Sequence, residues 1–306
     1  MGKKEYLLIA VLYGSLLAGI VFPGASVVAS GTIHYLMMTL LFLAFIKISP
    51  AVVGQALMSN WAGIIWGTLL RLVIAPAAAY WTTLALYPPL ALPILLLAGA
   101  STGVSSPFFT SLCRGNISYC LVMAVVTSLI LPLSLPAMVR LLAHATLDYD
   151  LAAMAQFLAI IIFAPLGAAF LFRALAPGRI EPLNRASYPI SLVVVAGINF
   201  GALGRYVPYL KTNPEQILYC ALFSIGLALV LALLGWSFAR NRSWADRVAA
   251  SGSQVWVNNI LIIALAVYMD QPLAATLGVF YLIPFYGLVV FFSVLANRVE
   301  PAAVAG

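Results

Sequence analysis

The stretch LLLAGASTGVSSPFFTSLCRGN, residues 95–116, begins as an apolar helix and turns polar halfway along, with Gly, Ser and Thr followed by Pro107. A second stretch, AASGSQVWVNNILIIALA at residues 249–266, interrupts its apolar run with Gly, Ser, Gln and Asn. A polar patch at mid-membrane depth predicts an unwound helix whose free backbone groups face a cavity. The plainer alternative is that small residues let helices pack closely. Two such interruptions in one chain favour a binding site.

The rest of the chain is mostly apolar, with 64% hydrophobic and 8% charged residues among its 306. A soluble domain of this length could not cover its surface with so few charges. Its apolar runs of about 20 residues match the length that a helix needs to cross a bilayer. They are too long and non-alternating for barrel strands. The composition predicts an all-α polytopic membrane protein with ten transmembrane helices, at residues 5–22, 30–49, 60–86, 89–113, 117–142, 150–174, 186–208, 213–239, 244–269 and 272–297.

Most of the 15 Lys and Arg residues fall on one side of these spans. The termini and the loops after even-numbered spans hold 11, the other loops hold 3, and Arg71 lies inside the third span. An excess of basic residues marks the cytoplasmic loops of membrane proteins. We therefore expect a multi-pass membrane protein with both termini in the cytoplasm. The net charge of +7 then reflects topology and not nucleic-acid binding.

The polar loop at residues 144–150 divides the chain into two halves of five spans each, residues 1–146 and 147–306. Because five is odd, the second half enters the membrane upside down relative to the first. This parity predicts two inverted five-helix repeats, a common plan among secondary transporters. The two interrupted stretches are each the fourth span of their half, which strengthens the prediction of a binding site.

Three stretches resemble the bile acid:sodium symporter (BASS) superfamily. They are CRGNISYCLVMAVVTSLILPLSLP at residues 113–136, AFIKISPAVV at residues 44–53 and GSQVWVNNILIIALA at residues 252–266. The resemblance implies a panel domain and a core domain, each drawn from both repeats, with broken fourth and ninth helices that cross each other. It also implies that organic anions bind beside the crossing and that two sodium ions bind behind it.

The positions that align with the first sodium site of this superfamily differ from its usual ligands. Ser106 matches, but Pro107 stands where the family usually has Asn. Cys120 and Ala124 replace two hydroxyl residues, and Gln254 replaces the acidic residue that both sites share. The resemblance therefore implies a bacterial ASBT-like transporter with degenerate sodium sites.

At the second site Asn258 stands where Gln is usual, and Arg71 aligns with a Gln on the third helix. Sodium needs several oxygen ligands, yet no acidic residue lies within a predicted membrane core. Two sodium ions beside an arginine would place three like charges in a low-dielectric space, where they repel by several kcal/mol. We therefore expect Arg71, Gln254, Asn258 and Ser106 to form a surrogate for the ion site.

Arg71 itself has three interpretations. It is a tethered replacement for the second sodium, it attracts the carboxylate of an organic anion, or it is structural. A mid-membrane arginine costs from about 2.5 to well over 10 kcal/mol, so it needs compensation. The expected partners are the side-chain oxygens of Gln254 and Asn258, the carbonyls of Val255 and Val257, and the negative end of a half-helix dipole.

Polar groups near the breaks are the predicted substrate contacts, and the resemblance implies that Asn259 touches substrate. Pro284 and Phe285 stand where some relatives carry a His-Asn pair, which makes the cavity more apolar. Interhelical hydrogen bonding explains Asn199 as well as ligand contact does. The predicted substrate-binding residues are Thr102, Ser105, Ser106, Asn259, Asn199 and Phe285.

These features predict a secondary transporter of small organic anions or amphipathic carboxylates that works by alternating access and without sodium. The alternatives are a sodium symporter with one rearranged ion site and a non-transporting membrane receptor. No nucleophile–base constellation, metal cluster or phosphate loop points to an enzyme or to a cofactor. The expected partners are the organic anion and the lipid bilayer, with no obligate protein partner. Exchange, facilitated diffusion and proton coupling stay open, His34 being the in-membrane group that titrates near neutral pH.

Overall fold

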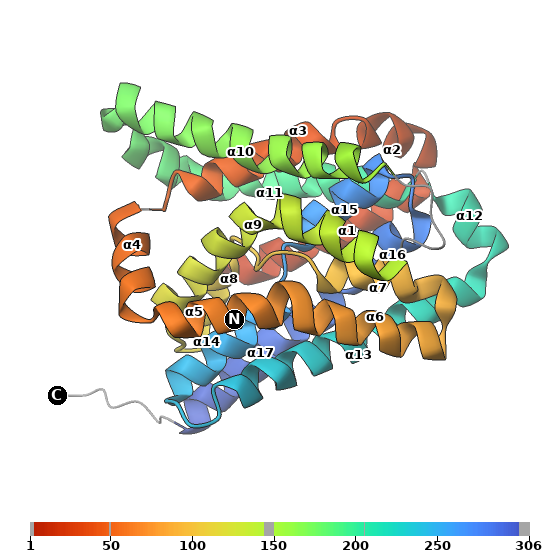
Figure 1. Cartoon of the computed structure of the whole chain (residues 1–306). Helices are drawn as coiled ribbons and strands as arrows, with labels where there is room; N and C mark the ends of the chain where they lie inside the picture. The colour runs from red at the N-terminus through yellow and green to blue at the C-terminus, as the bar shows by residue number, and fades with distance from the viewer. Residues whose placement is uncertain (1–2, 49, 144–149, 205, 300–306) are drawn as a thin grey trace.

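A computed structural model describes residues 3–48, 50–143, 150–204 and 206–299 of the chain. Within these ranges the regular structure is helical, apart from one isolated β-bridge (Figure 1). Nearly all of the predicted loop at residues 144–150 lies outside the described residues, and so does Arg205, one of the basic residues in the charge count.

The first half of the chain ends with two short helices, separated by a break, and then one long helix. In chain order they are α1 (Lys3–Val21), α2 (Pro23–Ser30), α3 (Ile33–Phe45), α4 (Pro50–Ser59), α5 (Trp61–Leu69), η1 (Leu70–Ile74), α6 (Ala75–Leu86), η2 (Pro88–Leu90), α7 (Ala91–Ala98), α8 (Ser106–Leu112) and α9 (Ile117–Ala143). Of these, η1 is one turn of π-helix that joins α5 to α6. The predicted third span, residues 60–86, is thus α5, η1 and α6 without interruption.

The second half follows a similar plan, with three long helices before its broken pair. In chain order they are α10 (Leu151–Leu175), η4 (Pro177–Arg179), α11 (Ile180–Gly204), α12 (Val207–Thr212), α13 (Pro214–Phe238), α14 (Trp244–Val255), α15 (Asn259–Tyr268), α16 (Pro272–Phe280) and α17 (Leu282–Val299).

Several helical stretches of the described chain are long and apolar enough to cross a membrane. Five meet this test alone: Trp61–Leu86, Ile117–Ala143, Leu151–Leu175, Pro214–Phe238 and Pro272–Ala296. A sixth is added if α2 and α3, which are bent by 61°, form one span. These stretches support a polytopic membrane protein. That ten helices cross the bilayer as two inverted repeats stays a prediction.

The helices pack in two groups (Figure 1). The outer layer consists of α1, α2, α3, α10 and α11, with α11 in contact with the three helices of the N-terminus. The crossing bundle consists of α5 to α9 and α13 to α17, and α9 also packs against α10 of the outer layer. The broken helices lie at the centre of the bundle, because α7 and α15 are buried over most of their length.

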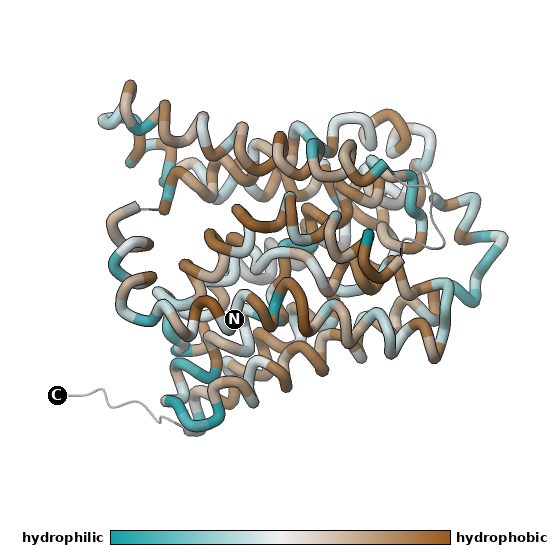
Figure 2. Tube along the Cα trace, in the orientation of Figure 1, coloured by the Kyte–Doolittle hydropathy of each residue, from teal (hydrophilic) through white to brown (hydrophobic). Residues whose placement is uncertain are grey.

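Polar residues gather at the two ends of the molecule, with apolar residues between them (Figure 2). Apolar side chains on the long helices remain exposed there, Leu229, Val230 and Leu233 on α13 among them. This is the surface that a bilayer would cover.

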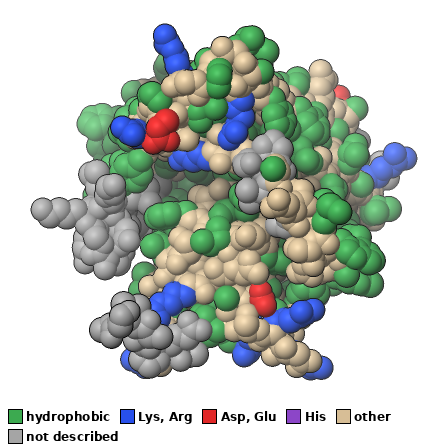
Figure 3. Space-filling view, turned by 90° about the vertical axis from the view of Figure 1, so that its left-hand side faces the viewer, with side chains coloured by type: hydrophobic (Ala, Val, Ile, Leu, Met, Phe, Trp, Pro, Cys, Tyr) green, Lys and Arg blue, Asp and Glu red, His purple; other side chains and the backbone are tan. Residues whose placement is uncertain are grey.

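At one end lie α4 and the turns α8–α9, α10–α11 and α13–α14, and Figure 3 shows Lys and Arg side chains around this face. We call it the basic end, defined by Lys47, Arg114, Arg173, Arg179, Arg185, Arg240, Arg242, Arg247 and Arg298.

Candidate functional site

Both predicted interruptions are confirmed as breaks between short helices. The first lies at residues 99–105, between α7 and α8, and the second at residues 256–258, between α14 and α15. Pro107 occupies the first turn of α8, where a proline is tolerated because that N–H has no helical partner. The broken helices therefore expose backbone groups in the middle of the protein.

The two breaks cross and pair with each other. Thr102 and Val257 form an antiparallel β-bridge. The amide of Gly103 donates to the carbonyl of Trp256 at 2.7 Å, and the amide of Asn258 donates to the carbonyl of Ser101 at 2.8 Å. These bonds satisfy backbone groups that neither broken helix can satisfy alone, which is what an interior without water requires.

The side chain of Thr102 reinforces this crossing. It is buried, and its hydroxyl donates to the carbonyl of Ser253 at 2.7 Å. The Thr102 amide donates to the hydroxyl of Thr127 on α9 at 3.0 Å. Thr102 was predicted to bind substrate, and the structure gives its hydroxyl and its amide partners within the protein.

Arg71 lies on the π-helical turn η1, and its side chain has no exposed surface. Its Nη1 donates to the carbonyl oxygen of Ala98 at 2.9 Å. Ala98 is the last residue of α7, so this carbonyl lies at the negative end of a half-helix dipole. One of the expected kinds of partner is thus observed. The carbonyl of Val255 instead accepts a hydrogen bond from the hydroxyl of Tyr281, at 2.8 Å.

Polar atoms around the crossing lack hydrogen-bond partners among the described residues. Arg71 Nε and Nη2, Gln254 Oε1 and Asn258 Nδ2 are all buried and unpaired. The amide group of Gln254 donates to the carbonyl of Gly67 at 3.3 Å and not to a group of η1. Because buried polar atoms are nearly always paired in proteins, these unpaired atoms make the crossing a candidate ligand or ion site.

Two of the residues that align with the first sodium site are hydrogen-bonded to each other. The thiol of Cys120 donates to the hydroxyl of Ser106, with 3.2 Å between sulfur and oxygen, and both side chains are buried. Ala124 is buried beside them on α9 and offers no side-chain oxygen. A thiol and a methyl group are poor ligands for a hard cation. The residues at this position do not fit sodium.

The predicted substrate residues lie in several places. Asn259 is buried at the start of α15, its Nδ2 donates to the carbonyl of Gly278 on α16, and its Oδ1 has no partner among the described residues. Phe285 packs edge to face on Phe109, with 5.3 Å between ring centroids. Ser105 is exposed at the start of α8, and Asn199 is buried on α11, in the outer layer.

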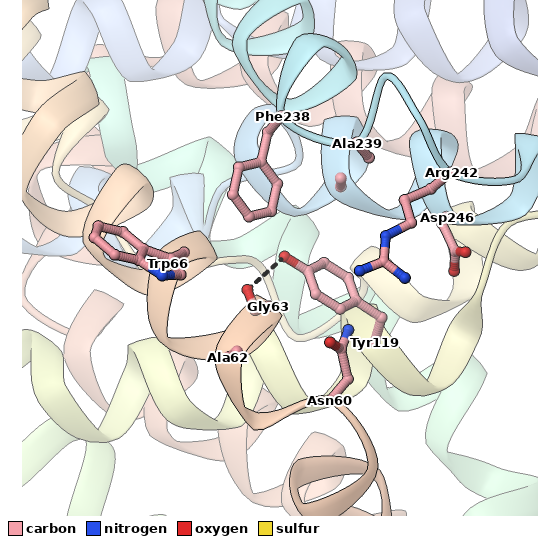
Figure 4. Close-up of a pocket in the computed structure, with 10 residues that line it drawn as sticks. Asn60, Ala62, Gly63, Trp66, Tyr119, Phe238, Ala239, Arg242 and Asp246 are labelled. Atoms are coloured by element: carbon pink, nitrogen blue, oxygen red, sulfur yellow. Dashed lines mark hydrogen bonds between the residues drawn. The ribbon is translucent and has the colours of Figure 1, made fainter.

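Two cavities lie away from these residues. The larger, of about 320 Å³, opens at the basic end beside α5 and α14, and Figure 4 shows its residues. The smaller, of about 250 Å³, lies between α3, α4, α9 and α10, and Arg173 is its charged side chain. Neither is lined by a predicted substrate residue.

The sequence prediction missed the polar side chains of the larger cavity, which are Asn60, Tyr119, Arg242 and Asp246. The sequence does contain one pattern that points to the helix beside this cavity. Gly63, Gly67 and Arg71 are spaced by four residues, which places them on one face of a helix. That face leads from the cavity towards the crossing.

The exposure of five carboxylates is described, and none of the five is buried. Asp150, Glu181, Glu215 and Asp270 are exposed, and Asp246 is partly exposed at the basic end. An ion pair joins Arg185 to Glu181 on the surface, at 3.1 Å. None of these five carboxylates is therefore buried beside Arg71 to balance its charge.

A family model described as the sodium bile acid symporter family matches residues 34–211. The match covers more than half of the chain and includes Arg71, the broken helices α7 and α8, the whole of the long helix α9 and most of the outer layer. No curated protein matches the chain significantly. Members of this family are membrane transporters and not enzymes. By this match and by its helical architecture, the chain is a multi-pass membrane protein that belongs to the sodium bile acid symporter family.

Proposed function

We propose that the protein is a secondary transporter that moves small organic anions or amphipathic carboxylates by alternating access. Family membership supports transport across a bilayer. The two helix groups supply the parts that alternating access needs, since the outer layer can serve as the panel and the crossing bundle as the core. The basic end would face the cytoplasm of a bacterium with an inner membrane, because basic loops are retained on that side.

The substrate contacts are proposed at the crossing. The unpaired Oδ1 of Asn259 and Nδ2 of Asn258 offer an acceptor and a donor at the start of α15. Thr102, Ser105 and Ser106 belong to the other break, and Phe285 gives the neighbouring surface an aromatic character. Asn199 lies on α11, a helix of the outer layer that contacts α15 and α16. A ligand between the two groups could therefore be touched from both.

Transport is proposed to be independent of sodium, with Arg71 in place of one sodium ion. The observation that carries this proposal is the fully buried guanidinium, which donates to the half-helix end at Ala98. A fixed cation at the crossing attracts the same carbonyl oxygens that a bound cation would attract. Gln254 supplies an amide where a carboxylate would be needed to offset sodium dehydration.

The test is counterflow of labelled organic anions by the purified protein in liposomes, with sodium or potassium as the only alkali cation. We expect equal exchange in both salts and loss of exchange in Arg71→Gln. Uptake driven by a sodium gradient would mean a symporter with a rearranged site. Saturable binding without exchange would mean a receptor, and full activity of Arg71→Gln would make the arginine structural.

A further inference from the structure

The guanidinium of Arg71 has more donors than acceptors around it. Nη1 is bonded to the Ala98 carbonyl, while Nε and Nη2 have no acceptor among the described residues. A buried charge is stable when paired and hydrogen-bonded, and the five carboxylates whose exposure is described are not buried with it. The unpaired edge of Arg71 is thus suited to an anion.

The larger cavity reaches towards this group from the basic end. It has a volume of about 320 Å³ and is bounded by α5, the start of α9 and the turn between α13 and α14. In Figure 4 the ring of Tyr119 lies in its middle, with Asn60 below and the guanidinium of Arg242 beside it. The Tyr119 hydroxyl points to the carbonyl of Gly63, 3.5 Å away.

A thin layer separates this cavity from Arg71. The hydroxyl of Tyr119 lies against Gly67, where even an added methyl group would collide with it. Gln254 approaches the same residue and donates to the Gly67 carbonyl at 3.3 Å. Arg71 follows Gly67 by four residues, on the π-helical turn that continues α5. The side chains that approach Gly67 are those of Tyr119, Gln254 and Met123.

Arg242 and Asp246 both line the cavity, so the charges of its own lining balance. The two oxygens of Asp246 accept hydrogen bonds from Asn116 and from Ser243, each at 2.9 Å. Figure 3 shows further Lys and Arg side chains on the face that holds the basic end. An excess of positive charge on this face raises the local concentration of anions.

We propose that this cavity is the entrance to a binding site for a small inorganic anion, such as chloride, at Arg71, with Tyr119 as the side chain that the ion must pass. A small ion is proposed, and not a larger ligand, because Arg71 has no exposed surface and lines neither cavity. The anion would accept from Nε and Nη2 and balance the buried charge. The proposal rests on the proposed function in one respect, that Arg71 is the fixed cation of the crossing.

Chloride binding to the intact purified protein tests this, measured as the shift of melting temperature in potassium chloride against potassium gluconate at equal ionic strength. We expect a saturable rise in the parent protein. In Arg71→Gln the affinity for chloride should fall roughly tenfold or more, as expected on losing a charge-assisted hydrogen bond. The absence of a saturable rise in the parent, or equal affinity in Arg71→Gln, would overturn the proposal. So would stronger binding of acetate, since it would assign the site to carboxylates.

The entrance is tested with two single-cysteine changes on α5. Ala62 lines the cavity and is exposed, whereas its neighbour Trp61 is exposed and does not line it. A bulky maleimide should react with both cysteines, but it should slow the binding of radioactive chloride, at least several-fold, at Ala62→Cys and not at Trp61→Cys. Chloride binding at the unmodified rate after labelling of Ala62→Cys would refute this entrance, even if Arg71→Gln does not fold. Sodium-independent exchange without chloride binding would contradict the anion site alone, and sodium-driven uptake would contradict the proposed function alone.

Discussion

At the scale of single residues, Arg71 is a fully buried charge with a hydrogen bond to one carbonyl oxygen. Placing an arginine at mid-membrane depth costs from about 2.5 to well over 10 kcal/mol. One hydrogen bond from a charged group returns only about 1.5–3 kcal/mol, and Arg71 makes one, to Ala98. The bound anion that we propose would supply further compensation, and charged residues inside membranes are functional by default.

The sequence predicted Arg71 as an intramembrane cation and the negative end of a half-helix as one kind of partner, but not which helix end it would be. The choice of Ala98 depends on where α7 ends and on the π-helical turn that rotates Arg71, and such ends vary by one or two residues. No local pattern around residue 71 encodes the end of a helix 27 residues away. The sequence suggested Gln254 and Asn258, which lie on the other broken helix and donate elsewhere or are unpaired.

A residue-scale prediction follows from the missing carboxylate. The double variant Arg71→Gln with Gln254→Glu removes the fixed cation and restores an acid at the crossing. We expect sodium to raise its melting temperature above that in potassium, because a carboxylate offsets the cost of dehydrating the ion. The parent protein should respond equally to both salts. Equal melting of the double variant in sodium and potassium would show that the first-site changes, Cys120 and Ala124, already prevent binding.

At the scale of elements, the sequence predicted the breaks but not how they pair. Gly, Ser and Pro residues showed where α7 and α14 would end, because they interrupt the apolar runs. The register that sets Thr102 opposite Val257 depends on two segments about 150 residues apart, so it is fixed only by packing. Likewise α4 forms a helix in residues 50–59, which lie between two predicted spans, and the bend between α2 and α3 was not predicted.

Gly103 offers an element-scale prediction. A side-chain methyl at this position would lie 2.9 Å from the carbonyl oxygens of Trp256 and Val257, both of them backbone atoms that cannot move aside easily. Gly103→Ala should therefore lower the free energy of unfolding by about 1–3 kcal/mol. The matched control is Gly226→Ala on α13, where an added methyl meets nothing within 4 Å.

The control change should be neutral or stabilising by up to about 1 kcal/mol, because alanine is the better helix former. Unfolding in sodium dodecyl sulfate, followed by circular dichroism, measures both variants against the parent. If Gly103→Ala were as stable as Gly226→Ala, the close approach of the two breaks would be wrong.

At the scale of the whole molecule, composition was enough to predict a polytopic membrane protein. The loops that are basic in the sequence lie at one end of the structure. Basic residues that are distant in sequence, such as Lys47, Arg114 and Arg242, meet at one end because successive helices alternate in direction (Figure 1). The cavities could not be predicted in this way. Tyr119 and Asp246 are unremarkable in the sequence and become neighbours of α5 only through the packing of α9 and α14.

The division into outer layer and crossing bundle gives the last prediction, because alternating access requires the two groups to move relative to each other. Ala202 on α11 and Val279 on α16 belong to different groups and pack in one small apolar cluster. A thiol cross-link between Ala202→Cys and Val279→Cys should abolish anion exchange, and reduction should restore it. The control pair, Ser224→Cys with Leu277→Cys, joins α13 to α16 within the bundle, where the Ser224 hydroxyl already meets the Leu277 carbonyl at 3.2 Å.

Cross-linking the control pair should leave exchange close to that of the parent, since both helices move together. The extent of cross-linking is read from mobility on gels, and exchange from counterflow in the same liposomes. The described cysteines, Cys113, Cys120 and Cys220, are free and buried, so the parent protein treated in the same way gives the background of cross-linking. Unchanged exchange with the Ala202–Val279 pair fully cross-linked would exclude relative motion at this contact. The transport cycle would then have to proceed by movements inside the crossing bundle, around the paired breaks themselves.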